Sequence, residues 1–310
     1  MRLALAAALI AASAVPATAA EMIFLETVRN TDVASFGMGY LRGVGTGTLN
    51  VTGLSGTVSK AYLFWHGPTN STDPNANATV SFGGSSVTGT NIGFSADNNW
   101  GFANSQAYRA DVTSLVTGNG SYAIDNFFKS SSVDINGLSL IVFFDDGNST
   151  NNFDVALFNG NDSNINNIYD ANNWNATLNG INYSSGTANL VLHVSDGQTF
   201  LDAAVIVNAT TIVPAGAIFQ GDGVQFGNGT IPVNGALWDI ESYDITALLS
   251  AGLNNLSLVS GVNEDALGLI VAQFNLPVGS APDPDPVPAP AVLGLFGAGL
   301  GLLALRRRRG

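Results

Sequence analysis

Residues 108–118 of this 310-residue chain read Tyr-Arg-Ala-Asp-Val-Thr-Ser-Leu-Val-Thr-Gly, and residues 242–252 read Ser-Tyr-Asp-Ile-Thr-Ala-Leu-Leu-Ser-Ala-Gly. Asp111 and Asp244 align, 133 positions apart. A second pair of blocks follows, Asp-Ile-Asn-Gly-Leu at residues 134–138 and Asp-Ala-Leu-Gly-Leu at residues 265–269, 131 positions apart. Two blocks that recur in the same order at nearly constant spacing indicate an internal duplication. The sequence therefore predicts two related domains, joined near residues 160–185.

The first block has a local physical explanation. Asp111 and Asp244 stand where a helix N-cap belongs, and Gly118 and Gly252 follow a short apolar turn. Asp is a favoured N-cap and Gly a favoured C-terminal residue of a helix. We therefore predict a helix of one to two turns in each copy, with the aspartates as caps rather than catalysts.

Short apolar runs recur along the body, each bounded by Gly, Asn or Asp; they are residues 60–65, 138–144, 189–194 and 203–207. Runs of five to seven residues with β-branched and aromatic content are typical of buried strands, and the body shows no sustained helical period. The predicted class is all-β, with two related β-sandwich (jelly-roll-like) domains at residues 21–165 and 166–280.

Residues 244–249 and 252–256 resemble the late strand region of jelly-roll modules in sugar-binding and glycosidase-accessory domains. Residues 61–65, 108–113 and 137–142 resemble a family of uncharacterised surface-protein domains of archaea and bacteria, the DUF3344 type. Both resemblances imply an architecture far more than a ligand.

The first 20 residues have the three parts of a secretory signal: Arg2, an apolar run at residues 3–15, and Pro-Ala-Thr-Ala-Ala at residues 16–20. The apolar run is too short for a bilayer core of about 30 Å. We expect signal peptidase to cut after Ala19 or Ala20, rather than a retained anchor.

The last 30 residues have a different three-part design. A Pro-rich linker at residues 281–290 precedes the uncharged residues 291–305, and Arg306, Arg307, Arg308 and Arg309 follow. The expected short hydrophobic helix contacts the membrane, with the arginines on the cytoplasmic side.

This order resembles the PEP-CTERM sorting signal of Gram-negative bacteria, which an exosortase-type enzyme processes. The sorting motif is Val287, Pro288, Ala289 and Pro290, where the usual form has Glu in place of Ala289. The resemblance implies an exported protein of the cell envelope, cell surface or extracellular matrix. A plain C-terminal anchor is the alternative.

Charge and cysteine content exclude several functions. Residues 21–285 carry all 23 acidic residues and five basic ones, a formal charge of −18, so nucleic-acid binding is not expected. With no cysteine, disulfides and thiolate metal sites are excluded. Divalent cations and neutral glycans are the compatible partners.

Oxygen-bearing side chains are densest after residue 144, where Asp145, Asp146 and Asp162 are candidate Ca²⁺ ligands. The segment lacks the EF-hand spacing, so a plain polar loop is the competing interpretation. No other cofactor is expected.

Two tryptophans in Asn-rich surroundings, Trp100 and Trp174, are candidate platforms for stacking on sugar rings, with structural packing as the alternative. Trp65 and Trp238 lie in or beside strands and are expected in the core.

No catalytic residue is predicted. The two histidines, His66 and His193, show no zinc-site spacing, and the chain has no Gly-x-Ser-x-Gly motif. The expected function is that of a non-catalytic matrix or envelope protein of an exopolysaccharide biofilm, with weak glycan binding. The alternatives are a secreted carbohydrate-active enzyme and a purely structural or adhesive surface protein.

Overall fold

The computed structural model describes residues 22–95, 101–169, 173–229 and 234–282. In the first half the strands are β1 (Ile23–Gly39), β2 (Gly47–Val51), β3 (Thr57–Thr69), β4 (Thr79–Phe82), β5 (Ser85–Thr88), β6 (Thr90–Ser95), β7 (Asn104–Asp111), β8 (Gly120–Asp125) and β9 (Gly137–Asp145). In the second half they are β10 (Phe153–Ser163), β11 (Trp174–Tyr183), β12 (Asn189–Ser195), β13 (Val205–Val207), β14 (Thr210–Val213), β15 (Gln225–Phe226), β16 (Trp238–Asp244), β17 (Gly252–Ser260) and β18 (Gly268–Pro277). The all-β class is confirmed.

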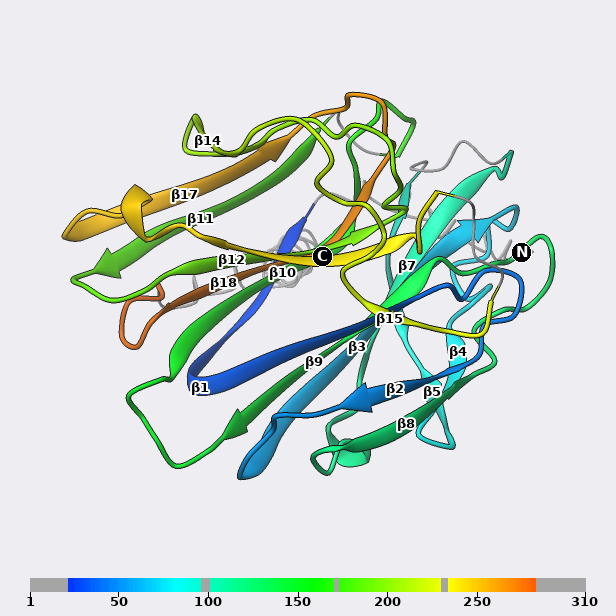
Figure 1. Cartoon of the computed structure of the whole chain (residues 1–310), viewed down its shortest axis with the longest axis horizontal. Helices are drawn as coiled ribbons and strands as arrows, with labels where there is room; N and C mark the ends of the chain where they lie inside the picture. The colour runs from blue at the N-terminus through cyan, green and yellow to red at the C-terminus, as the bar shows by residue number, and fades with distance from the viewer. Residues whose placement is uncertain (1–21, 96–100, 170–172, 230–233, 283–310) are drawn as a thin grey trace, which may run out of the picture.

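The strands form four stacked layers (Figure 1). We call them outer sheet 1 (β2-β8-β4-β5), inner sheet 1 (β1-β9-β3-β7-β6), inner sheet 2 (β16-β12-β18-β10) and outer sheet 2 (β11-β17-β13-β14). Each inner sheet packs on its own outer sheet, which makes two sandwiches. The inner sheets also pack on each other through a third apolar cluster, whose buried members are Phe64, Ala107, Ile141, Phe143, Val155, Leu157, Trp238, Ile270 and Val271.

Strand β1 passes from one inner sheet to the other. Its first part, from Ile23 to Thr31, pairs with β10, and its second part, from Asp32 to Met38, pairs with β9. The pairing register shifts between Val28 and Thr31, and Asn30 there has a φ of 48°. The two inner sheets are therefore hydrogen-bonded as well as packed together.

Within the inner sheets, β9, β10, β12 and β18 are buried on both faces over nearly their whole length, which explains the apolar runs at residues 138–144 and 189–194. On β3, Leu63 and Trp65 face outer sheet 1, whereas Phe64 faces inner sheet 2. Outer strand β8 instead alternates exposed and buried residues. A period-two pattern is therefore typical of an outer strand such as β8, and an unbroken apolar run is typical of a central inner strand such as β9.

The duplicated blocks occupy equivalent places. Asp111 ends β7 before the 3-10 turn η1 (Thr113–Leu115), and Asp244 ends β16 before η2 (Thr246–Leu248). The Thr113 N–H donates to Asp111 Oδ1 at 2.9 Å, and the Thr246 N–H donates to Asp244 Oδ1 at 2.8 Å. Each carboxylate thus bonds the first residue of the turn, but the predicted N-cap position is wrong: Val112 and Ile245 are the N-cap residues, one position after each aspartate, and each helix is a single 3-10 turn.

The pairing order is also symmetric, because β7-β3-β9-β1 in one sandwich corresponds to β16-β12-β18-β10 in the other. His66 on β3 lies opposite Ala107, and His193 on β12 lies opposite Ile240; these partners stand four residues before Asp111 and Asp244. Relative to the neighbouring strands β7 and β16, the two histidines therefore hold equivalent positions, whereas a register shift between β12 and β18 brings Ser195 rather than His193 opposite Gly268.

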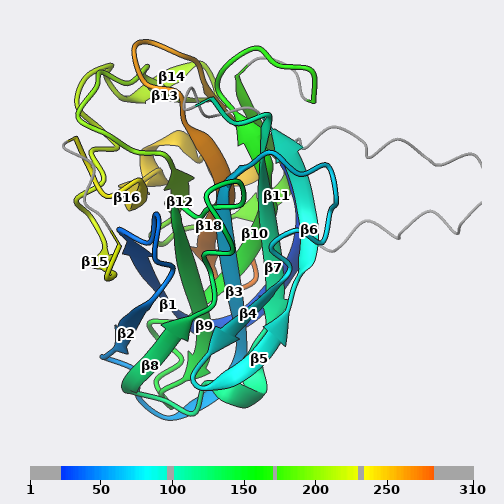
Figure 2. The ribbon, with the colours of Figure 1, turned by 90° about the vertical axis from the view of Figure 1, so that its right-hand side faces the viewer.

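The change between the sandwiches falls in the turn at residues 146–152, because β10 pairs with β18 along its length. Residues 153–163, which the predicted first domain at residues 21–165 includes, thus lie in inner sheet 2. Strands β6 and β7 pass beside β10 (Figure 2), and the Arg109 guanidinium donates to Asn159 Oδ1 at 2.7 Å across the layers.

Within the described residues, no helix has the length and apolar character needed to cross a membrane. The predicted signal peptide, the motif at residues 287–290, the hydrophobic helix at 291–310 and Arg306–Arg309 lie outside the described residues.

Candidate functional site

The two tryptophans proposed for sugar stacking have different outcomes. Trp100 lies outside the described residues. Trp174 is fully buried on β11, with its ring centroid 5.6 Å from that of Phe219. It therefore exposes no face to a sugar ring, and the stacking role assigned to it is wrong. Trp65 and Trp238 are fully buried, as the sequence indicated.

The candidate cation ligands are only partly brought together. Asp145 ends β9 and Asp146 begins the turn that follows. Asp32 of β1 joins them, and the carboxylate oxygens of the three residues lie within 4.8 Å of one another. Asp162 lies near the opposite end of β10, is 1% exposed, and accepts the Asn175 N–H at 2.9 Å. The acidic turn, as we call Asp32, Asp145 and Asp146, therefore replaces the predicted set.

The acidic turn is held by hydrogen bonds of its own. Asp32 Oδ2 accepts the Asp146 N–H at 2.9 Å, and Asp146 accepts the Asn148 N–H at 2.7 Å. Burial, and then the neighbouring carboxylates, raise the pKa of Asp32, whereas hydrogen bonds from Asn148 and Asn151 lower the pKa of Asp146. Sequence reasoning missed Asp32 because strand pairing alone brings it opposite Phe144.

A pocket of about 440 Å³ adjoins this turn. Its lining combines hydroxyl, amide and backbone groups with a few apolar ones, and consists of Ser149, Thr150, Asn151, Asn152, Phe153, Gly186, Thr187, Pro277 and Val278. Asn151 Nδ2 donates to Asp146 Oδ2 at 3.1 Å, so one side chain contacts both the pocket and the acidic turn. No charged residue lines the pocket, which suits a neutral, hydroxyl-rich ligand.

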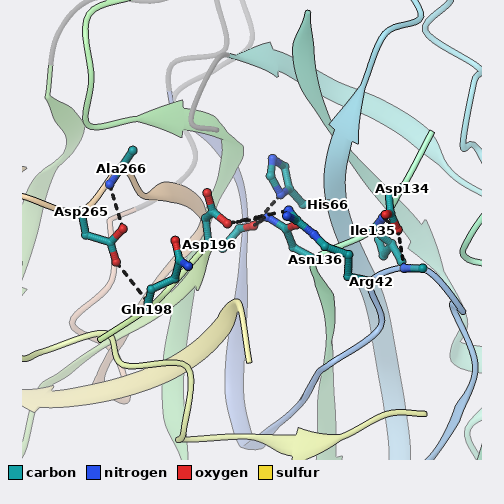
Figure 3. Close-up of polar contacts among 11 residues, drawn as sticks. Arg42, His66, Asp134, Ile135, Asn136, Asp196, Gln198, Asp265 and Ala266 are labelled. Atoms are coloured by element: carbon teal, nitrogen blue, oxygen red, sulfur yellow. Dashed lines mark hydrogen bonds and ion pairs between the residues drawn. The ribbon is translucent and has the colours of Figure 1, made fainter. Parts of the chain in front are cut away.

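A polar network crosses the seam between the two sandwiches (Figure 3). Ser195 Oγ lies 2.5 Å from His66 Nδ1, and Asn136 Nδ2 donates to Ser195 Oγ at 3.0 Å. Arg42 donates to Asn136 Oδ1 at 2.6 Å and forms an ion pair with Asp196 at 3.9 Å. His66, Asn136 and Ser195 are each 0% exposed.

The Ser195–His66 contact has the groups of a nucleophile and its base, but both lie where solvent does not reach. A substrate would have to enter a packed interior. In the described residues the network joins β3 to the end of β12, so its evident effect is to hold the sandwiches together.

The second duplicated block also has a structural role. Asp134 Oδ1 accepts the N–H groups of Ile135 and Gly43 at 2.8 and 2.9 Å. Asp265 accepts the N–H groups of Ala266 and Gln198 at 2.9 and 3.1 Å (Figure 3). Each aspartate therefore ties the start of a late strand to a distant loop.

Asp202, Asp239 and Asp265 are buried carboxyl groups in the second sandwich. Asp239 accepts the Gly221 N–H at 2.8 Å, and Asp202 accepts the Phe219 N–H at 2.8 Å, which orders the loop at 216–223. Burial raises the pKa of Asp239 and of Asp265 to about 7. The sequence offers one signal for Asp239, a carboxylate next to a buried tryptophan in a strand.

No protein-family model and no curated protein matches this chain.

Proposed function

We propose that this chain is an exported, surface-sorted, non-catalytic protein of the envelope or exopolysaccharide matrix, which binds neutral glycans weakly. The two terminal segments support export, with signal peptidase and an exosortase-type enzyme as processing partners. The location is the outer side of the envelope or the extracellular matrix of a Gram-negative bacterium.

The charge of the body favours neutral partners. Each basic side chain of residues 21–285 already contacts an acceptor of the body: Arg29 with Asp154, Arg42 with Asp196, Lys60 with Glu26, Arg109 with Asn159, and Lys129 with the Thr79 carbonyl. A polyanion would therefore meet a strongly acidic surface whose cations are already engaged.

The uncharged pocket beside the acidic turn is the observation that carries the glycan proposal. Its hydroxyl and amide groups, together with Phe153 and Pro277, match the mixed polar and apolar faces of a sugar. The proposed glycan-binding site is therefore this pocket and not Trp174, which the sequence suggested as a stacking platform.

The test uses the protein recovered from its own cells, on a glycan array run with a reducing-sugar assay. Thr187→Arg should block the pocket and abolish retention, whereas Thr52→Arg, also at an exposed threonine, should not. Retention without turnover supports the proposal. Turnover supports a carbohydrate-active enzyme, and no signal in either assay supports a purely structural or adhesive protein.

A further inference from the structure

A short segment from the second half of the chain lies across the edge of the first sandwich. Residues 225–229, which we call the strap, contain β15, and β15 pairs in parallel with the end of β1, where Phe226 lies opposite Gly39. The Gln225 side chain donates to the Asn50 carbonyl and accepts the Asn50 N–H, both at 2.8 Å. The strap therefore contacts both β1 and the edge strand β2.

Close backbone contacts fix the strap after Phe226. The Gly227 N–H donates to the Gly39 carbonyl at 2.9 Å, and the Gly229 N–H donates to the Tyr40 carbonyl at 2.7 Å. An added Cβ would lie 2.9 Å from the Tyr40 oxygen at Gly227 and 2.5 Å from it at Gly229, so this close approach requires glycine. The backbones that carry Tyr40 and Phe226 are therefore held rigidly against each other.

Tyr40 and Phe226, which we call the aromatic pair, display their rings on this backbone. The ring centroids are 4.7 Å apart and the ring planes meet at 67°, an edge-to-face contact. Such a contact occupies an edge of one ring and one face of the other. Phe226 remains 58% exposed, more than any other aromatic side chain of the described residues. The pair therefore offers an open ring face to a ligand.

The size and the polarity of this surface favour a sugar over a protein partner. A stable protein interface buries about 800 Å² per partner, whereas two aromatic side chains offer at most about 500 Å². The strap places neutral amides beside the rings: Gln225 binds the edge of β2, and the exposed Asn228 donates to Thr46 Oγ1 at 3.3 Å. A ring face with neutral amide and hydroxyl groups beside it suits the apolar face and the hydroxyls of a neutral sugar.

We propose that the aromatic pair is a second contact site for neutral glycans, on which a sugar ring stacks. The inference rests on the proposed function, because both sites take the same class of ligand. Met38 lies opposite Leu138 near the start of β9, whereas the acidic turn and its pocket follow the end of β9 at Asp145 (Figure 1). The nine residues of β9 span about 27 Å, so the two sites lie at opposite ends of this strand.

Two weak sites at this separation give a long polymer an avidity that a short oligosaccharide lacks. The test measures retention of the protein, recovered from its own cells, on an array of neutral β-glucans, galactans and mannans, each present as long polymer and as short oligosaccharide. Phe226→Leu keeps apolar bulk but removes the ring face, and it should lower retention on the long polymers at least about tenfold. Phe226→Trp keeps a ring face and should retain binding.

Phe200→Leu is the matched control, because Phe200 is another exposed phenylalanine, at 44%, and its replacement should leave retention unchanged. Equal melting temperatures of Phe226→Leu and Phe226→Trp exclude unfolding as the cause of a loss. Unchanged retention in Phe226→Leu, or an equal loss in Phe200→Leu, would overturn the second site.

Thr187→Arg, which blocks the pocket, separates this inference from the proposed function. Retention that falls in Thr187→Arg but not in Phe226→Leu overturns the second site and supports the pocket. A loss in Phe226→Leu but not in Thr187→Arg supports the aromatic pair and contradicts the pocket. A wild-type protein that no polymer retains overturns both sites.

Discussion

Ser195 Oγ lies 2.5 Å from His66 Nδ1, and this contact crosses the seam between the two sandwiches. His66 and His193, one in each sandwich, are 127 positions apart in the sequence. Ser195 and His66 are both 0% exposed. A buried polar pair of this kind stabilises only while every partner is present, because an unsatisfied group in the interior keeps its full desolvation cost. The stability of the seam should therefore be sensitive to the loss of either partner, although other polar pairs, such as Arg109 with Asn159, also join the inner sheets.

Ser195→Ala should lower the free energy of unfolding by about 1–3 kcal/mol, because His66 Nδ1 and Asn136 Nδ2 each lose a partner. Urea titration followed by tryptophan fluorescence measures this loss. Ser86→Ala on the exposed edge strand β5 is the control and should change stability by less than about 0.5 kcal/mol. If Ser195→Ala and Ser86→Ala unfold at the same urea concentrations, the polar network does not hold the two sandwiches together.

The duplication predicts a matched pair of effects. Thr113 Oγ1 accepts the Ala61 N–H, and Thr246 Oγ1 accepts the Ala188 N–H, both at 2.9 Å. Thr113→Val and Thr246→Val should each cost about 1 kcal/mol, since each leaves one backbone donor without its acceptor. Because the two sites share no partner, the double variant should lose the sum. Denaturant midpoints of the three variants provide the measurement, and a loss confined to one site would contradict equivalence.

The repeat could be predicted from the sequence because each aspartate bonds the N–H of the threonine two residues later, which leaves a local pattern in the chain. The acidic turn could not be predicted in full, because Asp32 reaches Asp145 only through the pairing of β1 with β9. The same holds for Ser195 and His66, which belong to different sandwiches. Contacts of high sequence separation leave no local pattern.

Trp174 was misassigned for a different reason. Its neighbours Asn173 and Asn175 suggested a loop, but β11 is an outer strand that buries Trp174, Ala176 and Leu178 and exposes the residues between them. The polar residues are thus the solvent face of a period-two pattern, which is expected for a half-buried strand. Alternation was the signal that distinguishes this tryptophan from an exposed one.

Buried carboxyls predict a loss of stability as pH rises. Burial raises the pKa of Asp239 and of Asp265 from 3.8 to about 7, so the folded state retains protons that the unfolded chain has released within that window. The free energy of unfolding contributed by each group therefore falls from pH 3.8 to about 7, with a slope on the order of 1.4 kcal/mol per pH unit. It is lost above about pH 7.

His193 acts in the opposite direction, since burial lowers its pKa from 6.5 to about 3 and its contribution is lost as pH falls through that range. Asp265→Asn removes one of the two carboxyl contributions and should make melting temperature rise more, or fall less, between pH 5 and 7 than in wild type. Asp244→Asn is the control, because the lowered pKa of Asp244 confines its effect to more acidic solution. An unaltered slope in Asp265→Asn would contradict a buried, protonated carboxyl.

The calcium hypothesis from the sequence now concerns Asp32, Asp145 and Asp146. If Ca²⁺ binds there, ten times its Kd should stabilise the fold by about 1.4 kcal/mol, and chelator should reverse the shift in melting temperature. Asp145→Asn should remove the response, whereas Asp125→Asn, an exposed carboxylate of β8, should retain it. If the melting temperature changes with neither Ca²⁺ nor chelator, the calcium hypothesis is wrong and this segment is a plain polar turn.

Substitutions of Trp174 test most directly whether this residue belongs to the apolar core or to a glycan-binding surface. Its ring is fully buried against Phe219, so Trp174→Ala should create a cavity and cost about 3–5 kcal/mol. Trp174→Phe keeps an aromatic ring in the same core and should cost less, while removing an indole Nε1 that makes no hydrogen bond within the described residues. Glycan retention by the folded Phe variant should equal that of wild type, because the ring never contacts solvent. Lost retention with unchanged stability would instead place a sugar on this tryptophan and contradict its position in the fold.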